Sequence, residues 1–269
     1  MNNTELQKLK YWFSQYTNQY SSRNSIHREA YKLKIGHSAK VSRICADIGR
    51  SINLNNEDIA LAETIGLFHD IGRFEQFSRY KTFLDRKSEN HADLGVKVLQ
   101  ESQILNHLDI DIQEIIRKAI SYHNRLKIPD EESPRVILFG KLIRDADKLD
   151  IFDLVGTYYN GNGRSAVIEL DLPDEPGYST EMLSDLFKNR LADMKKMKTL
   201  NDFKLLQLGW VYDLNFPITV KRIKERQYLE AIRKSLPVSE EIDALMDHLN
   251  QHLGRLVATP PPLKKGWNG

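Results

Sequence analysis

Residues 66–74 of the chain read GLFHDIGRF, so that an imidazole and a carboxylate, His69 and Asp70, follow directly on an apolar segment. Hydrophobic cores seldom take such polar groups unless the groups are hydrogen-bonded or bind a metal ion. Helical periodicity puts three more histidines, His37, His91 and His123, on or beside apolar stripes elsewhere in the chain. The pattern predicts that these polar groups converge within one helical core.

Each of the four histidines belongs to a different predicted helix, and Asp147 lies on the inward face of the next long helix. Imidazole nitrogens and carboxylate oxygens that converge in a core form a site suited to Fe, Mn, Co, Zn or Ni. We therefore expect one or two divalent transition metal ions as cofactors. The alternative is that the histidines are buried structural groups held by hydrogen bonds.

Apolar residues recur at helical spacing along most of the chain, and only 14 Gly and 9 Pro interrupt its 269 residues. Few turn formers in a chain with 28% charged and 41% hydrophobic residues favour helices with short connections, so we predict an all-α fold. A strand-like alternation is confined to residues 167–172. Helices are expected over 4–20, 29–52, 57–69, 109–123, 136–158, 180–197, 200–212, 218–236 and 239–253, with one more after an Asn90 cap.

The turn-forming stretch NGNG interrupts the helical pattern and predicts a junction between two helical parts. Residues 1–158 are expected to form a metal-binding helical domain whose core lies at about residues 30–155. An irregular junction over 159–178 then leads to a helical C-terminal extension over 179–258. The tail, 259–269, has three consecutive prolines and is expected to be flexible.

Charge and cysteine content exclude several classes of protein. Lys and Arg number 39 against 37 Asp and Glu, a net charge of +2, which argues against a dedicated nucleic-acid surface or a polybasic membrane surface. The single cysteine, Cys45, excludes an internal disulfide and a Cys-based zinc cluster. The charged N-terminus does not fit a signal peptide, and no apolar run has the roughly 18 residues of a membrane span. We therefore expect a cytoplasmic protein with no membrane partner, which is compatible with a homo-oligomer.

The order His37, His69-Asp70, His91, His123, Asp147 resembles that of the HD-domain superfamily of metal-dependent phosphohydrolases. The resemblance is carried by the segments GHSAKVSRICADIG, GLFHDIGRF, NHADLGVKVL, SYHN and RDADKLD. It implies an all-α, HD-type helical bundle, to which the C-terminal helices are an extension. It also implies that one metal is held by His37, His69, Asp70 and Asp147, and a second by Asp70, His91 and His123. Asp70 then bridges the two ions, and a hydroxide between them attacks phosphorus in line, which gives Asp70 a catalytic role.

The last carboxylate has three candidates, because RDADKLD contains Asp145, Asp147 and Asp150. The family pattern Ala-Asp-x-Leu points to Asp147. Asp145 or Asp150 can orient a ligand imidazole from behind, and the alternative for both is a solvated acid on the helix surface.

The segment after the His-Asp pair, residues 73–88, is locally basic and is predicted to be a substrate lid. Arg73 occupies the position of the basic residue in the family's His-Asp-Ile-Gly-Lys/Arg motif. The resemblance therefore implies that Arg73 contacts phosphate and takes part in catalysis, a task suited to its planar fork. Arg79, Lys81 and Lys148 are further candidates for substrate binding, with a solvated surface charge as the alternative for each.

The implied function is that of a metal-dependent phosphohydrolase acting on a nucleotide or another small phosphoester. The expected partner is therefore a small phosphorylated substrate. The chain lacks the Gly-Tyr-Pro turn of the cyclic-di-GMP branch and the Leu-His-Asn ending of the (p)ppGpp hydrolases, so neither activity is expected. Two alternatives stay open: an HD-fold mixed-valent di-iron oxygenase with the same ligand order, and a non-catalytic nucleotide-sensing module.

Overall fold

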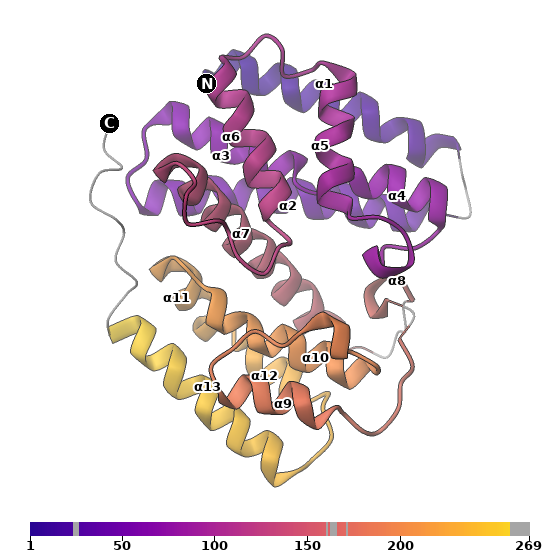
Figure 1. The fold of residues 1–269 in the computed structure, drawn as a ribbon, viewed down its shortest axis with the longest axis vertical. Helices are drawn as coiled ribbons and strands as arrows, with labels where there is room; N and C mark the ends of the chain where they lie inside the picture. The colour runs from indigo at the N-terminus through magenta and orange to yellow at the C-terminus, as the bar shows by residue number, and fades with distance from the viewer. Residues whose placement is uncertain (24–26, 160, 162–165, 171, 259–269) are drawn as a thin grey trace. The chain divides into compact units, whose positions relative to one another are not determined.

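A computed structural model of the chain describes residues 1–23, 27–159, 161, 166–170 and 172–258. These residues form helices joined by connecting segments, and none of them forms a β-strand (Figure 1). The all-α fold predicted from the sequence is therefore confirmed. The chain divides into two compact units, one built from Met1–Asp150 and the other beginning at Ile151.

The N-terminal unit contains all the helices that carry candidate metal ligands. In this unit α2 packs against α3, α4 against α5, and α5 against α6. Its elements are α1 (Asn3–Arg23), α2 (Arg28–Ser51), α3 (Asn56–Phe68), α4 (Gly72–Tyr80), the 3₁₀ helix η1 (Asp85–Lys87), α5 (His91–Ser102), α6 (Ile110–Tyr122) and the greater part of α7 (Pro134–Tyr159).

Asparagine side chains begin two of these helices. The Asn55 side-chain oxygen accepts a backbone N–H of the first turn of α3, and the Asn90 side-chain oxygen accepts the backbone N–H groups of Ala92 and Asp93. Such caps satisfy N–H groups that lack a partner within the helix. The Asn90 cap therefore makes His91 the first residue of α5.

Two glycines allow backbone approaches that no other residue would permit. A Cβ atom at Gly66 would lie 2.8 Å from the Ser42 Cα atom on α2, and one at Gly72 would lie 2.5 Å from the Gly95 backbone nitrogen on α5. Interiors are packed to crystal-like density, so these contacts leave no room for a methyl group. The His69-Asp70 pair lies in the turn between the two glycines, and both contacts position it.

The segment predicted as a lid begins as a packed helix. Residues 72–80 form α4, on which Phe74 and Phe77 are buried within an aromatic cluster that includes Tyr31. The helix ends at Lys81, whose φ of 56° is left-handed. The first half of this segment is thus anchored in the core.

The C-terminal unit is also helical in its described residues. Within it α9 packs against α10 and α13, and α11 packs against α12 and α13. Its elements are α8 (Ala166–Glu169), α9 (Thr180–Phe187), η2 (Met194–Lys196), α10 (Leu200–Gly209), η3 (Trp210–Asp213), α11 (Pro217–Glu225), α12 (Tyr228–Arg233) and α13 (Glu240–Ala258).

Three local expectations for this unit are wrong. Within 167–172, where a strand was expected, the described residues include the helical turn α8. The helix expected over 180–197 ends at Phe187, and the one expected over 218–236 is divided into α11 and α12. Residues with positive φ follow each of the two breaks, Asn189 at 54° and Gln227 at 52°. A left-handed backbone cannot continue a right-handed helix.

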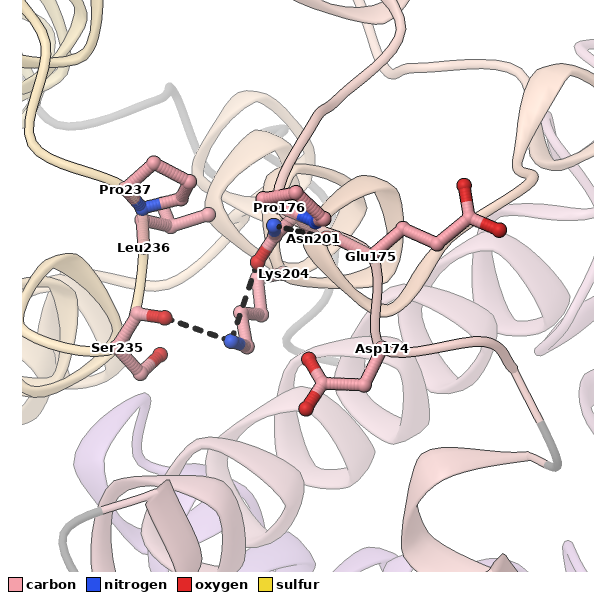
Figure 2. A pocket seen from close by; sticks show the side chains of 8 residues that line it. All are labelled: Asp174, Glu175, Pro176, Asn201, Lys204, Ser235, Leu236 and Pro237. Atoms are coloured by element: carbon pink, nitrogen blue, oxygen red, sulfur yellow. Dashed lines mark hydrogen bonds between the residues drawn. The ribbon is translucent and has the colours of Figure 1, made fainter.

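A pocket in the C-terminal unit is lined in part by Lys204 of α10 (Figure 2). The Lys204 side chain is buried, and its Nζ atom donates to Asn201 Oδ1 at 3.2 Å and to the Ser235 carbonyl oxygen at 2.7 Å. Neutral oxygens of the fold thus hold the ammonium group in place. Across the parts of the chain that the structure describes, no helix has the length and apolar character to cross a bilayer.

Candidate metal centre

Four side chains from three segments of the N-terminal unit converge on one point. The His37 Nε2 atom lies 3.2 Å from His69 Nε2 and 3.0 Å from Asp147 Oδ1. Asp70 Oδ2 lies 3.6 Å from His37 Nε2 and 3.7 Å from His69 Nε2. Two nitrogen and two oxygen donors therefore surround a position that suits an ion with bonds of about 2 Å.

A second donor set shares Asp70 with the first. The His91 Nε2 atom lies 3.0 Å from His123 Nε2 and 3.3 Å from Asp70 Oδ1. All three side chains are buried, and their donor atoms lie within 4.8 Å of one another. The structure thus brings together the residues that the sequence predicts for a second metal.

The two carboxylate oxygens of Asp70 face different histidine pairs. Oδ2 is the oxygen nearest to His37 and His69, whereas Oδ1 is nearest to His91. A carboxylate in this orientation can give one oxygen to each of two ions. The bridging arrangement implied by the resemblance is therefore compatible with the geometry.

Each histidine presents Nε2 to the centre because an acceptor occupies its other ring nitrogen. The Nδ1–H groups of His69 and His123 donate to backbone carbonyl oxygens one turn earlier, Gly66 O at 2.8 Å and Ile120 O at 2.6 Å. Backbone oxygens only accept, so these two rings carry their proton on Nδ1. Their Nε2 lone pairs are left for a metal.

Carboxylates play the same part for the other two histidines. His37 Nδ1 lies 2.7 Å from Asp150 Oδ2, and His91 Nδ1 lies 2.8 Å from Asp85 Oδ2. An acidic partner behind a ligand imidazole sets its tautomer and raises its basicity. Of the two other acids in RDADKLD, Asp150 has this role. Asp145 is buried and does not lie on the solvated helix surface.

The chemistry of the His91–His123 pair favours a cation between the rings. Burial lowers the pKa of His123 to about 3, with help from His91, and burial also lowers the pKa of His91. Both rings are therefore neutral at pH 7, with their protons on the Nδ1 atoms that donate to Asp85 and Ile120. Two Nε2 lone pairs then face each other at 3.0 Å, an arrangement that a positive ion stabilises.

The carboxylates of the centre are held in their ionised form. Burial by itself would raise the pKa of Asp70, but Lys34 and the neighbouring histidines hold that pKa well below its usual range. Burial is likewise outweighed at Asp147, where a hydrogen bond from His37 and the neighbouring His69 ring lower the pKa. Both groups can therefore bind a cation at neutral pH without first losing a proton.

Sequence reasoning missed two residues that touch this centre. Lys34 precedes His37 by one helical turn, and its Nζ atom lies 2.7 Å from Asp70 Oδ2. Asp85 contacts His91 from a 3₁₀ helix that has no periodic signal in the sequence. The i, i+3 spacing to His37 could have indicated Lys34, because residues three apart share a helix face.

Arg73, the predicted phosphate contact, is bound within the protein. Its guanidinium donates to Gln76 Oε1 at 2.9 Å, Asp85 Oδ1 at 3.0 Å and the Phe83 carbonyl oxygen, and its Nε lies 3.4 Å from Asp70 Oδ1. Its side chain is only 15% exposed. Arg73 therefore links Asp70, the candidate bridging carboxylate, to Asp85, which contacts His91 Nδ1.

The other predicted substrate residues have local partners. Arg79 forms a helix-surface ion pair with Glu75 at 2.9 Å, and the exposed Lys81 donates to the Ser78 carbonyl oxygen. Lys148 is buried, and its ammonium donates to a backbone oxygen one turn earlier, at 3.3 Å. Their role toward a substrate stays a prediction.

Comparison with known proteins gives one match. Residues 35–151 match the family model of the HD domain, a range that contains every candidate metal ligand from His37 to Asp147. This part of the chain is therefore an HD domain, and the resemblance inferred from the sequence is confirmed. No curated protein and no solved structure matches the chain.

Proposed function

We propose, on the premise that residues 35–151 form an HD domain, that the protein is a metal-dependent phosphohydrolase acting on a nucleotide or another small phosphoester. The observation that carries the proposal is the orientation of Asp70, which offers one oxygen to each of two histidine pairs. When bound, a pair of divalent ions supplies a water-derived nucleophile near neutral pH and offsets charge on the phosphoryl oxygens.

The chain's own residues hold this centre in a reactive arrangement. Asp85 and Asp150 orient two of the rings, and backbone oxygens orient the others, so the Nε2 atoms need not rearrange when ions bind. The one thiol of the chain, Cys45, is buried, and burial raises its pKa well above the usual range. Cys45 therefore offers no thiolate nucleophile, which fits a reaction whose nucleophile comes from water.

Positive charge beside the centre favours an anionic substrate. The Lys34 ammonium and the Arg73 guanidinium lie on the two oxygens of Asp70, and Phe83 packs beneath both cations at 5.4 and 5.9 Å from its ring centre. Cations next to a metal centre attract and orient phosphate groups. This feature favours an anionic substrate such as a phosphoester.

A metal-dependent substrate panel tests the proposal. Protein purified without chelators is analysed for metal, loaded in turn with Mn²⁺, Fe²⁺, Co²⁺, Zn²⁺ and Ni²⁺, and supplied with nucleotides and simple phosphoesters. We expect phosphate or alcohol release that depends on metal and is lost in His69→Ala, whereas the exposed His107→Ala variant keeps it. Oxygen uptake by the iron form without phosphoester cleavage would assign the oxygenase activity instead. Metal binding with neither reaction would assign a sensing module.

A further inference from the structure

Lys34 is the one cation among the described residues that lies against Asp70 Oδ2. It lies on α2, one turn before His37, and its ammonium is 2.7 Å from the Asp70 oxygen that also faces His37 and His69. Its side chain is 18% exposed, so Lys34 lies at the edge of the centre. Within the described part of the chain, Asp70 is its one hydrogen-bond partner.

Arg73 differs from Lys34 in how firmly it is held. Arg73 bonds to acceptors on Asp70, Gln76, Phe83 and Asp85, so moving it toward a ligand would break several interactions. Lys34 would have to give up one hydrogen bond. The oxygen that accepts this hydrogen bond, Asp70 Oδ2, is one that a metal would bind.

We propose that Lys34, and not Arg73, binds a phosphate oxygen of the substrate at the edge of the metal centre. The inference rests on the proposed function and names the group that recognises its substrate. A divalent ion bound to Asp70 Oδ2 would compete with the ammonium for this acceptor. The ammonium carries three N–H donors and stays beside the centre, where a phosphate oxygen bound next to the ion replaces the lost acceptor.

The competing explanation is that Lys34 only supports Asp70. The two roles predict opposite effects when the charge is removed. A cation beside a metal site repels the metal, so Lys34→Gln should bind metal at least as tightly as wild type if Lys34 serves the substrate. The same variant should bind phosphate more weakly. A supporting role would instead lower metal binding as well.

Inorganic phosphate is the probe for this test. Calorimetric titration of the metal-loaded protein is compared for wild type, Lys34→Gln and Lys34→Arg, with metal affinity measured on the same preparations. Lys32→Gln is the matched control, because Lys32 lies on the same helix, is 58% exposed and pairs with Glu29 away from the centre. We expect Lys34→Gln to lose about tenfold or more in phosphate affinity, as for one charge-assisted contact. Lys34→Arg should stay within about threefold of wild type because the charge remains, and Lys32→Gln should equal wild type.

A second measurement uses wild-type protein and does not depend on the variants folding. Acetylation of lysines by an amine-reactive reagent is followed by mass spectrometry on the metal-loaded protein, with and without phosphate. We expect phosphate to slow modification of Lys34 by about threefold or more and to leave Lys32 unchanged, because a bound oxygen shields the amine. Equal rates at Lys34 would overturn the proposal, as would Lys34→Gln protein that binds phosphate normally or that loses its metal.

The outcomes separate this inference from the proposed function. If phosphate binding depends on Lys34 but the protein hydrolyses no phosphoester, the anion site is supported and the hydrolase proposal is wrong. If metal-dependent hydrolysis is undiminished in Lys34→Gln, the hydrolase proposal is supported and the anion site at Lys34 is wrong.

Discussion

The Asp85 carboxylate lies 2.8 Å from His91 Nδ1, on the side of the ring opposite the metal centre. Loss of such a partner lowers metal affinity by about 10–100-fold. We therefore expect Asp85→Ala to retain the ion held by His37, His69 and Asp147 and to lose the one held by His91. Metal analysis after dialysis should then give close to half the wild-type content. The exposed Asp111→Asn variant is the control, and equal metal content in all three proteins would contradict the role of Asp85.

Removal of metal should destabilise the N-terminal unit. An ion that binds only the folded state at 100 times its Kd contributes about 2.7 kcal/mol. For a domain of this size, that corresponds to a fall in Tm of roughly 5–10 °C on chelation. Thermal unfolding with and without EDTA measures this fall in Tm. His69→Ala should show a much smaller effect of EDTA, and a wild-type Tm that is indifferent to EDTA would argue against a metal-binding centre.

Metal binding should release a proton from His37. Burial lowers the pKa of His37, but hydrogen bonds with Asp147 and Asp150 outweigh burial and raise it to about 9. At pH 7.5 the metal-free ring is thus protonated, and a metal ligand must be neutral, so loading should release about one proton per chain. The pKa of His123 lies at about 3, so that ring has no proton to release.

Calorimetry in two buffers of different ionisation enthalpy counts these protons. Asp150→Asn removes a group that raises the His37 pKa, so this variant should release fewer protons at pH 7.5. Release that falls as the pH rises through about 9 would follow from the same pKa. An identical proton count in wild type and Asp150→Asn would show that His37 does not hold the proton.

The candidate metal ligands were predictable from the sequence because helical periodicity and residue type carry the information. His37, His91 and His123 lie on apolar stripes, and polar groups there need partners. Lys34 and Asp85 were missed for a different reason. A lysine on a helix and an acid in a loop are ordinary surface residues in a sequence, and only the packing of α2, η1 and α5 around Asp70 shows what they contact.

The helix breaks of the C-terminal unit also could not be predicted from the sequence pattern. Asn189 and Gln227 adopt left-handed backbone conformations although neither is a glycine. Glutamine gives no signal for the end of a helix and asparagine gives a weaker one than glycine, so the sequence pattern over 180–197 and 218–236 is continuous. The cost of one left-handed residue is about 1–2 kcal/mol, which tertiary packing can offset.

Removal of Arg73 should destabilise the fold as well as change the charge of the site. Its guanidinium joins Asp70, Asp85 and the Phe83 carbonyl oxygen, and its side chain is 15% exposed. Hydrogen bonds to charged groups contribute about 1.5–3 kcal/mol each when intact, and loss of the cation leaves two carboxylates without this partner. We expect Arg73→Ala to destabilise the protein by about 2–4 kcal/mol and to bind metal more weakly at His91, since Asp85 would keep Gln76 and Asn124 as partners but lose its cation.

Arg79→Ala is the matched control for this last prediction. Arg79 lies on the same helix, is 47% exposed and pairs with Glu75 on the surface, so its removal should cost below about 1 kcal/mol. Urea unfolding of both variants, together with metal analysis, measures the difference. Arg73→Lys should recover part of the stability, because an ammonium keeps the charge but cannot replace both donor nitrogens, Nε and Nη1, through which Arg73 reaches Asp70 and Asp85. If Arg73→Ala keeps wild-type stability and both metals while kcat/KM falls, then Arg73 binds the substrate, and its contacts with Asp70 and Asp85 are not required for the fold.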